Sequence, residues 1–93
     1  MPKIILQGHI LVPESDLLTV QEALTIHIKL TQQEVGCLTF DVRQDQNNRN
    51  KFNIYEEFEN RKAFEYHQLR VKASAWAGLT KNVTRHYQIT ESE

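Results

Sequence analysis

The sequence predicts an α+β fold, in which one antiparallel sheet carries two helices on a single face. Four stretches are rich in β-branched residues or alternate apolar and polar side chains, as strands do. Two longer stretches repeat apolar residues every three or four positions, as helices do. Their order is β-α-β-β-α-β, the split βαβ arrangement of ferredoxin-like domains. Since 93 residues leave room for one compact unit, residues 1–93 are expected to form a single domain.

The first predicted strand covers residues 3–12, an apolar run that ends at Pro13. Ser15 or Asp16 then offers a side chain that can cap the free amides of a helix. That helix is predicted from residues at helical spacing, and Gly36 ends it. The residues at this spacing form one stripe along the helix, which contains Leu17, Val20, Leu24, His27, Ile28 and Thr31.

The middle of the chain predicts a hairpin. Residues 37–45 and 52–58 alternate with a period of two, and the polar residues 45–50 form the turn between them. In the first of these strands one side is expected to hold Leu38, Phe40 and Val42. In the second, one side is expected to hold Phe52, Ile54, Glu56 and Phe58.

A second helix is predicted from a cap at Asn60 to about Trp76 or Gly78. Its apolar stripe contains Ala63, Phe64, His67, Gln68, Val71 and Ala75. Residues 83–90 alternate again and predict the last strand. One side of that strand is expected to hold Val83, Arg85, Tyr87 and Ile89.

The first strand also predicts a partner. If Gln7 and His9 face the helices, then Ile4, Leu6 and Ile10 lie on the sheet face that has no helix to cover it. An exposed apolar surface of that kind usually binds another protein. Pairing two such faces gives a dimeric α/β-barrel, so the chain is expected to form a homodimer.

The composition excludes several classes of partner. Eleven basic and twelve acidic residues are interspersed along the chain, which is not the charge pattern of a protein that binds nucleic acid. The longest apolar run is too short to cross a membrane, and the N-terminus lacks the features of a secretory signal. We therefore expect a cytoplasmic protein. Its single cysteine, Cys37, is interpreted as a small buried side chain, with a nucleophile as the alternative.

No glycine-rich phosphate loop, paired-cysteine motif or nucleophile elbow occurs in the sequence, and no spacing demands a metal. Four histidines remain as candidates. His27 is expected in the core or at an interface, and His86 in solvent or at an interface. His67 is expected in the layer between sheet and helices, where either packing or function would explain it.

Glu56 is expected in the same layer as His67. Apolar neighbours would raise the pKa of its carboxyl group toward that of a useful base. The alternative is an ion pair with Arg70 or Arg85. Gln7 and His9 would add polar groups to a pocket with apolar walls, the usual form of a small-molecule site, and the walls would include Phe40 and Trp76.

Five segments together resemble the antibiotic biosynthesis monooxygenase domain family. The most specific of them read E-V-G-C-L-T-F, I-Y-E-E-F and A-F-E-Y-H. The segments are residues 8–13, 27–31, 34–40, 52–58 and 63–68. The resemblance covers nearly the whole chain.

The resemblance implies a homodimer that binds a small aromatic molecule between sheet and helices. It also implies a cofactor-independent monooxygenase that oxidises a quinol or hydroxyarene with O2, with the substrate anion reducing the oxygen. His67 would then be the base or an orienting donor, and Phe40, Phe58 and Trp76 would hold the ring.

The sequence is also compatible with other functions. The cavity could bind a small molecule without turnover, or the protein could have a purely structural role. Relatives of the same fold degrade haem, but of the matching positions Gln7, Phe58 and His67 only the histidine agrees. Others isomerise or degrade phosphorylated molecules, yet no cluster of Arg or Lys is predicted to face the pocket. Fold alone does not choose among these activities.

Overall fold

The computed structural model describes residues 2–92. The elements, in chain order, are β1 (Lys3–Leu11), a short 3₁₀ turn (Glu14–Asp16), α1 (Leu17–Gln32), β2 (Cys37–Gln44), β3 (Lys51–Phe58), α2 (Arg61–Lys72), α3 (Ala75–Leu79) and β4 (Thr84–Ser92). The predicted α+β fold and the order β-α-β-β-α-β are therefore confirmed, with the short helix α3 as an addition. None of the helices in this part of the chain is long and apolar enough to span a membrane.

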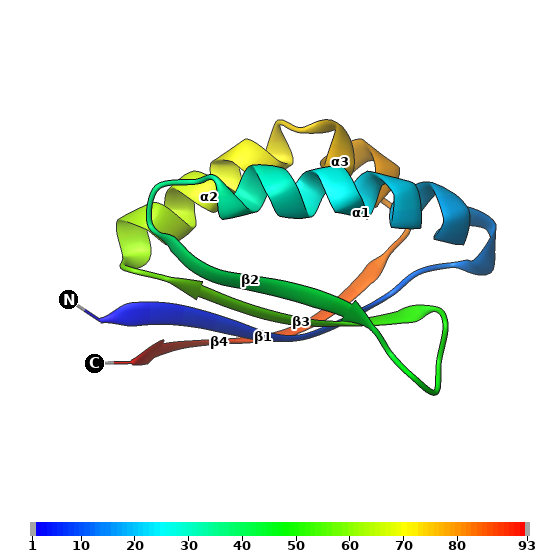
Figure 1. The fold of residues 1–93 in the computed structure, drawn as a ribbon, viewed down its shortest axis with the longest axis horizontal. Helices are drawn as coiled ribbons and strands as arrows, with labels where there is room; N and C mark the ends of the chain where they lie inside the picture. The colour runs from blue at the N-terminus through cyan, green and yellow to red at the C-terminus, as the bar shows by residue number, and fades with distance from the viewer. Residues whose placement is uncertain (1, 93) are drawn as a thin grey trace.

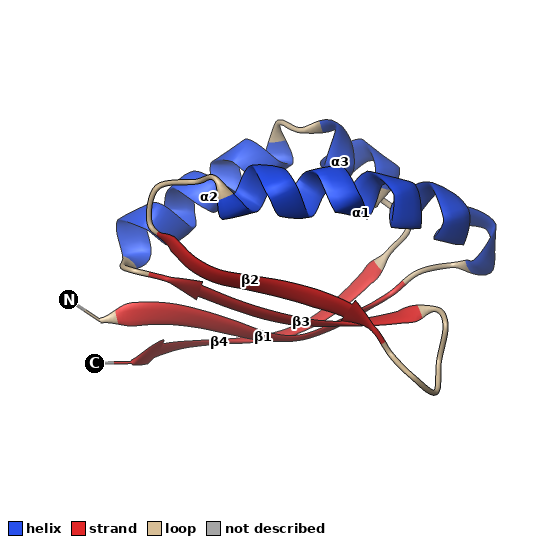
Figure 2. Cartoon of the chain, in the orientation of Figure 1, coloured by secondary structure: helices blue, strands red, loops and turns tan. Residues whose placement is uncertain are grey.

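The four strands form one sheet in the order β2-β3-β1-β4, and every neighbouring pair is antiparallel. Figure 1 shows α1, α2 and α3 together on one side of this sheet. Figure 2 shows the other side of the same sheet without a helix. The molecule therefore has a helix-covered face and an open face, and every side chain of the sheet belongs to one of them.

The two faces of β1 are the reverse of the prediction. Ile4, Leu6 and Ile10 are buried under the helices, whereas Gln7 is exposed on the open face. His9 lies on the open face too, where its ring stacks on that of His86 with centroids 4.7 Å apart. Alternation separates two sets of side chains but does not say which set is inside. The set with Ile4, Leu6 and Ile10 is more apolar than the set with Gln7 and His9, so its burial releases more free energy and decides the orientation.

The hairpin keeps most of its predicted pattern. Side chains of Phe52, Ile54, Glu56 and Phe58 all lie on the helix-covered face, as expected. In β2 the register shifts between Cys37 and Thr39, which is a β-bulge. The bulge leaves Leu38 half exposed and turns Cys37 toward the core instead. The prediction that Leu38 shares a side with Phe40 and Val42 is therefore wrong.

Helix α1 buries the predicted stripe, which includes Val20, Leu24 and His27. Asp16 is the residue before the helix, but its side chain caps no amide. Asn60 does cap α2, since its side-chain oxygen accepts a hydrogen bond from the Ala63 amide at 2.9 Å. On α2 only Phe64 and His67 are fully buried.

The second helix is shorter than predicted. It ends at Lys72 because Ser74 adopts an extended backbone, with ψ of 163°. The Ser74 hydroxyl donates to the Val71 carbonyl at 2.7 Å, which satisfies one of the free carbonyls at the helix end. Trp76 consequently lies on α3, where the Thr80 hydroxyl donates to its carbonyl oxygen at 2.7 Å. The short helix thus sets the position of the tryptophan independently of α2.

Candidate functional site

A row of three ionisable side chains lies between the helices and the sheet. His67 is the middle member, with Glu34 on one side and Glu56 on the other. Its Nδ1 is 3.0 Å from Glu34 Oε1, and its Nε2 is 3.8 Å from Glu56 Oε1. All three side chains are almost fully buried. Such a cluster in an apolar layer is unusual, because charged groups lose their hydration there.

Glu56 lies in the interior of the sheet, with a neighbouring strand on each side. It lies on β3, paired with Leu6 of β1 and Phe40 of β2, and the residue is only 6% exposed. Within residues 2–92 no polar atom is within hydrogen-bonding distance of its Oε1. Burial, together with the negative charge of Glu34, raises the pKa of Glu56 to about 8. The carboxyl group is therefore neutral at pH 7, and it makes neither of the ion pairs considered above.

His67 is also neutral at pH 7. Burial lowers the pKa of its imidazole, and the hydrogen bond to Glu34 opposes this only in part. The ring packs against Phe58 with centroids 4.9 Å apart, and Phe40 lies 5.9 Å away. Two neutral groups, one an acid and the other a base, thus face each other across the core.

Glu34 is positioned by the turn that follows α1. Its amide donates to the Thr31 carbonyl at 3.0 Å, and its own carbonyl accepts from the Cys37 amide at 3.2 Å. Gly36 continues this turn with φ of 91°, and a Cβ there would lie 2.5 Å from the Cβ of Ala63. The glycine therefore lets the turn approach α2, which brings the Glu34 carboxylate to Arg70 and His67.

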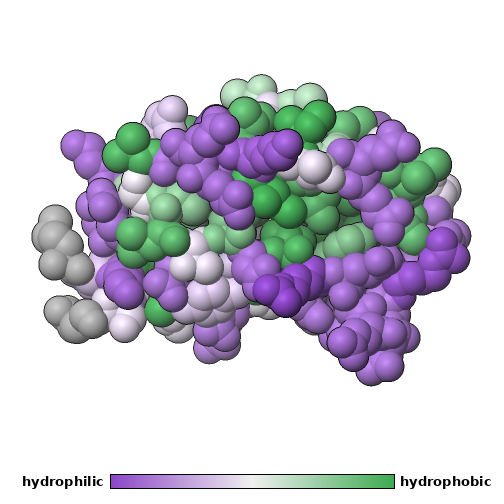
Figure 3. All heavy atoms as spheres, in the orientation of Figure 1, coloured by the Kyte–Doolittle hydropathy of each residue, from purple (hydrophilic) through white to green (hydrophobic). Residues whose placement is uncertain are grey.

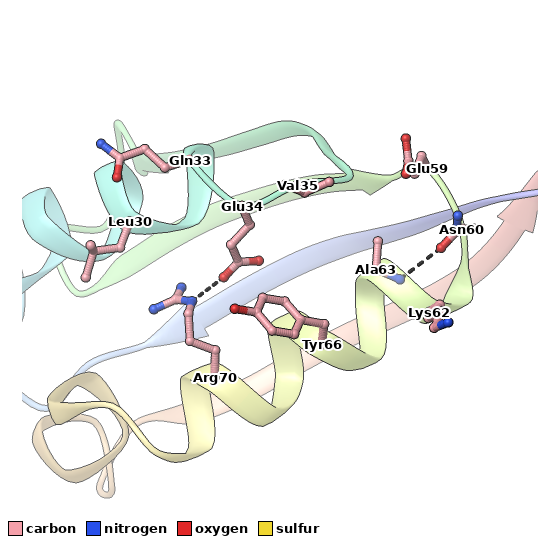
Figure 4. A pocket seen from close by; sticks show the side chains of 10 residues that line it. All are labelled: Leu30, Gln33, Glu34, Val35, Glu59, Asn60, Lys62, Ala63, Tyr66 and Arg70. Carbon is pink, nitrogen blue, oxygen red and sulfur yellow. Dashed lines mark hydrogen bonds and ion pairs between the residues drawn. The ribbon is translucent and has the colours of Figure 1, made fainter.

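An outer groove of about 530 Å³ separates α1 from α2 beside this turn. Figure 4 shows Glu34 directed across the groove toward Arg70, with Tyr66 next to them. Arg70 donates to the Glu34 carboxylate and, at 2.9 Å, to the Thr31 hydroxyl. The groove is lined by Leu30, Gln33, Glu34, Val35, Glu59, Asn60, Lys62, Ala63, Tyr66 and Arg70.

On the opposite side of the row, Glu56 faces a small inner cavity of about 30 Å³. This volume holds about one water molecule. Figure 3 shows apolar atoms gathered in a hollow between α1 and the sheet, framed by polar ones. The cavity is lined by Ile10, Leu24, His27, Phe40, Val42, Ile54, Glu56, Trp76, Arg85 and Tyr87.

A stacked pair closes this cavity toward the helices. The rings of His27 and Trp76 are parallel to within 7°, with centroids 4.4 Å apart. Burial and the positive charges nearby lower the pKa of His27 to about 4, so its ring is neutral at pH 7. The same two residues also line an apolar crevice of about 140 Å³ between α1 and α3. The pair is therefore the wall between the crevice and the inner cavity.

The structure brings together some of the predicted site residues and not others. His67, Glu56, Phe40 and Trp76 all lie around the inner cavity or directly behind it. Phe58 is completely buried, packed between His67 and Phe64, and does not line the cavity.

Gln7 and His9 are the two residues that do not belong to this site. Both lie on the open face, with the whole thickness of the sheet between them and Glu56. The expectation that they add polar groups to the pocket is wrong, because it depended on the reversed orientation of β1.

Sequence reasoning missed Glu34 and the role of His27 as a cavity wall. Glu34 is 33 residues from His67 in the chain, and no local pattern joins the two. The buried stripe of α1 places His27 correctly, but it gives no sign of the contact with Trp76.

The thiol of Cys37 is half-buried, and burial raises its pKa to about 11. This favours the interpretation of Cys37 as a packing residue over that of a nucleophile.

Comparison with known proteins identifies the family of the chain and supports its fold. The model of one protein family, described as antibiotic biosynthesis monooxygenase, matches residues 4–78. No curated protein matches the chain. A solved structure from Deinococcus radiodurans, of a proposed antibiotic biosynthesis monooxygenase, is 26% identical with a TM-score of 0.78, covering 97% of this chain and 90% of that one.

Two further solved structures share the fold. A conserved protein from Methanosarcina mazei has 17% identity and a TM-score of 0.80, covering 100% of this chain and 95% of its own. A Bacteroides thetaiotaomicron protein of unknown function, described as a possible oxidoreductase, has 20% identity and a TM-score of 0.76, with 97% of each chain covered.

Proposed function

Because the chain belongs to the antibiotic biosynthesis monooxygenase family, we propose that it oxidises a small aromatic quinol or hydroxyarene with O2, without a bound cofactor. In this proposal Glu56 and His67 remove the proton that activates the substrate. The sheet and the helices supply the walls of a water-poor site.

The observation that carries the proposal is Glu56 Oε1, a buried carboxyl oxygen with no hydrogen-bond partner among residues 2–92. A buried polar atom without a hydrogen bond costs free energy, roughly 1–3 kcal/mol, and such atoms are uncommon in folded proteins. A hydroxyl group on an aromatic substrate is a donor that would satisfy Glu56 Oε1. A carboxyl group with a pKa of about 8, beside a neutral histidine, has the properties of a general acid or base near neutral pH.

The proposed reaction begins with loss of the substrate's hydroxyl proton to the Glu56–His67 pair. The resulting phenolate is electron-rich and can transfer electrons to O2 directly. For a hydroxyarene, one oxygen atom then enters the ring to form a quinone, and the other leaves as water. The substrate supplies all the electrons, so that in the simplest case one phenol and one dioxygen give one benzoquinone and one water.

The apolar crevice between α1 and α3 is the proposed binding place. An apolar cavity of about 150 Å³ can hold one benzene ring, and the crevice has about 140 Å³. A ring bound there would contact Trp76 and His27. To reach Glu56, the substrate must displace Trp76 from the stack, because the inner cavity has room for little more than a water molecule.

The direct test is oxygen uptake with a panel of quinols and hydroxyarenes. Glu56→Gln and His67→Ala should each lower the turnover rate by roughly 100-fold or more, the usual contribution of a general acid or base. Glu57→Gln is the matched control, since Glu57 is the next residue but lies on the open face. Equal rates above the uncatalysed reaction in all four proteins would remove both residues from the mechanism.

Labelled oxygen distinguishes oxygenation from simple oxidation. With 18O2 and a hydroxyarene substrate, the proposal requires one labelled atom in the quinone and one in water. A quinone without label would contradict it.

The small volume of the inner cavity favours a second candidate, a protein that binds an aromatic molecule in the crevice without turnover. Native mass spectrometry of the purified protein would detect such a ligand. A bound metabolite that is not consumed under air would support this candidate over the oxygenase.

The residues of the site do not fit a haem. One nitrogen of His67 is bonded to Glu34 and the other faces Glu56, so neither is directed into a cavity. Gln7 is on the opposite face of the sheet.

We further propose that the protein is a homodimer in the cytoplasm. Two apolar side chains on the helix-facing side of β4, Tyr87 and Ile89, are 39% and 48% exposed. A partner subunit that covers this strand would bury both. Sedimentation equilibrium tests this proposal, and a monomer at all protein concentrations would contradict it.

A further inference from the structure

The row Glu34, His67 and Glu56 connects the outer groove with the inner cavity. Glu34 lines the groove, Glu56 lines the cavity, and His67 lies between them and lines neither. We propose that Glu34 is a positioning residue, which holds His67 as the Nδ1-protonated tautomer so that Nε2 is free to receive the proton of Glu56. The tautomer follows from the contacts alone, whereas its part in turnover rests on the proposed function.

The assignment of the tautomer starts from Arg70. Its guanidinium donates to Glu34 and to the hydroxyl of Thr31, which is completely buried. A carboxylate paired in this way can only accept hydrogen bonds. Both of its oxygens lie near His67 Nδ1, at 3.0 and 3.2 Å. The hydrogen of a neutral imidazole must therefore be on Nδ1, and the lone pair is on Nε2.

In this tautomer the unprotonated Nε2 of His67 faces Glu56. The contact of 3.8 Å to Glu56 Oε1 is too long for a hydrogen bond at rest, and Oε1 has no other partner within the described chain. A small movement of either side chain would let Nε2 accept the Glu56 proton. With the opposite tautomer, an N–H would point at Glu56 and Glu34 would have no donor from the ring.

The proton balance has two steps. First, the proton of the neutral Glu56 carboxyl passes to His67 Nε2, which forms a carboxylate and an imidazolium. Second, the carboxylate takes the hydroxyl proton of the substrate. The net transfer is from the substrate to His67, and the Glu34 carboxylate stabilises the imidazolium, as the third member of a catalytic triad does.

Other ionisable groups also face this pair. On α1 it is His27, whose ring is neutral at pH 7, and on α2 it is Arg70, whose positive charge disfavours an imidazolium at His67. On β4 they are Arg85 and Tyr87, which line the cavity. On β2 it is Cys37, whose thiol pKa is raised to about 11. Among the groups that contact His67 directly, Glu34 supplies the negative charge at hydrogen-bonding distance.

The test is nitrogen NMR of the protein with 15N-labelled histidine, at a pH where His67 is neutral. His67→Gln identifies the His67 signals among those of the four histidines. The wild type should show a protonated Nδ1 and an unprotonated Nε2. In Glu34→Gln this pattern should be lost in favour of the other tautomer or a mixture. Glu59→Gln, which removes a carboxylate from the same groove but not from His67, should keep it.

Kinetics supply a second readout. If the oxygenase function holds, Glu34→Gln should lower kcat about 10- to 100-fold with KM nearly unchanged, because Glu34 lines neither the crevice proposed to bind the substrate nor the inner cavity. Glu34→Asp, which restores the carboxylate, should recover part of kcat.

The two proposals fail in different ways. A wild-type protein with no oxygenase activity but with the Nδ1–H tautomer would contradict only the proposed function. A wild-type His67 protonated on Nε2 would overturn the inference, whatever the activity. The wild-type spectrum decides the tautomer even if Glu34→Gln does not fold.

Discussion

Glu56 and Glu57 are neighbours in the chain but lie on opposite faces of the sheet. On the helix-covered face, burial raises the pKa of Glu56 to about 8. On the open face, a hydrogen bond from Tyr55 and the charge of Lys3 lower the pKa of Glu57. The same functional group thus becomes a neutral acid at one position and a carboxylate at the next, because alternation along a strand changes its surroundings completely.

The histidines on the two sides of the sheet also differ in their surroundings. His67 is enclosed by aromatic rings and held by Glu34, whereas His86 is exposed and stacks on His9. Chemistry that needs a neutral carboxyl group beside a neutral imidazole therefore belongs to the covered face. Substitutions of matched residues on the two faces test this contrast.

The largest effect is expected for Phe58→Ala. Phe58 is completely buried between Phe64 and His67, so the substitution leaves a cavity in the core. The free energy of unfolding should fall by roughly 3–5 kcal/mol. Urea denaturation followed by circular dichroism would measure this. A loss below about 1 kcal/mol would mean that the covered face is not packed as described.

The second effect concerns the pH dependence of stability. The pKa of Glu56 is near 4.5 when unfolded and about 8 when folded, so the folded state binds its proton more tightly. The contribution is complete below pH 4.5 and is lost as pH rises toward 8, with a slope of at most about 1.4 kcal/mol per pH unit. His67 and His27 have lowered pKa values, which affect stability only as pH falls below about 6.5.

Between pH 6.5 and 8 the fall in stability should therefore come from Glu56. Glu56→Gln should flatten the slope in this range, and Glu57→Gln should leave it as in the wild type. Urea midpoints at four or five pH values would show this. An unchanged slope in Glu56→Gln would be incompatible with a raised pKa at this residue.

A smaller effect is expected from the stacked pair. Trp76 is the only tryptophan, so its fluorescence reports the His27 contact without interference. Protonation of His27 should change the intensity with a midpoint near pH 4, because burial lowers its pKa to about that value. His27→Gln should remove this transition. A midpoint near 6.5 in the wild type would show that the ring is exposed to solvent.

The smallest effect is expected for Tyr55→Phe on the open face. The substitution removes the hydrogen bond from the Tyr55 hydroxyl to Glu57, which is solvent-accessible. Unfolding free energy should change by less than about 1 kcal/mol. Oxygen uptake should be unchanged, since the sheet separates Tyr55 from Glu56. A loss of activity as large as that of Glu56→Gln would break the proposed division between the faces.

Much of this contrast could be predicted from the sequence. The alternation around Ile54, Glu56 and Phe58 places a carboxyl group in an apolar layer, and helical spacing places His67 above it. Both positions are confirmed, because each pattern has only one arrangement that buries its large apolar side chains. The short polar turn and the cap at Asn60 set the hairpin and the start of α2 in the same way.

The remaining features depend on information that no local pattern holds. In β1 both sets of alternating side chains contain apolar residues, so the orientation of Gln7 and His9 is decided by the total burial of the sheet. The bulge at Leu38 depends on the pairing of β2 with β3. Glu34 reaches His67 only because Gly36 brings the turn against α2.

The central claim is that Glu56 is a neutral carboxylic acid at pH 7, and infrared spectroscopy tests it directly. The difference spectrum between the wild type and Glu56→Gln should contain the carbonyl band of a protonated carboxyl group at pH 7. The band should disappear with a midpoint near pH 8, the pKa given by burial and by the charge of Glu34. Absence of this band at pH 7, with a midpoint near 4.5, would contradict the account.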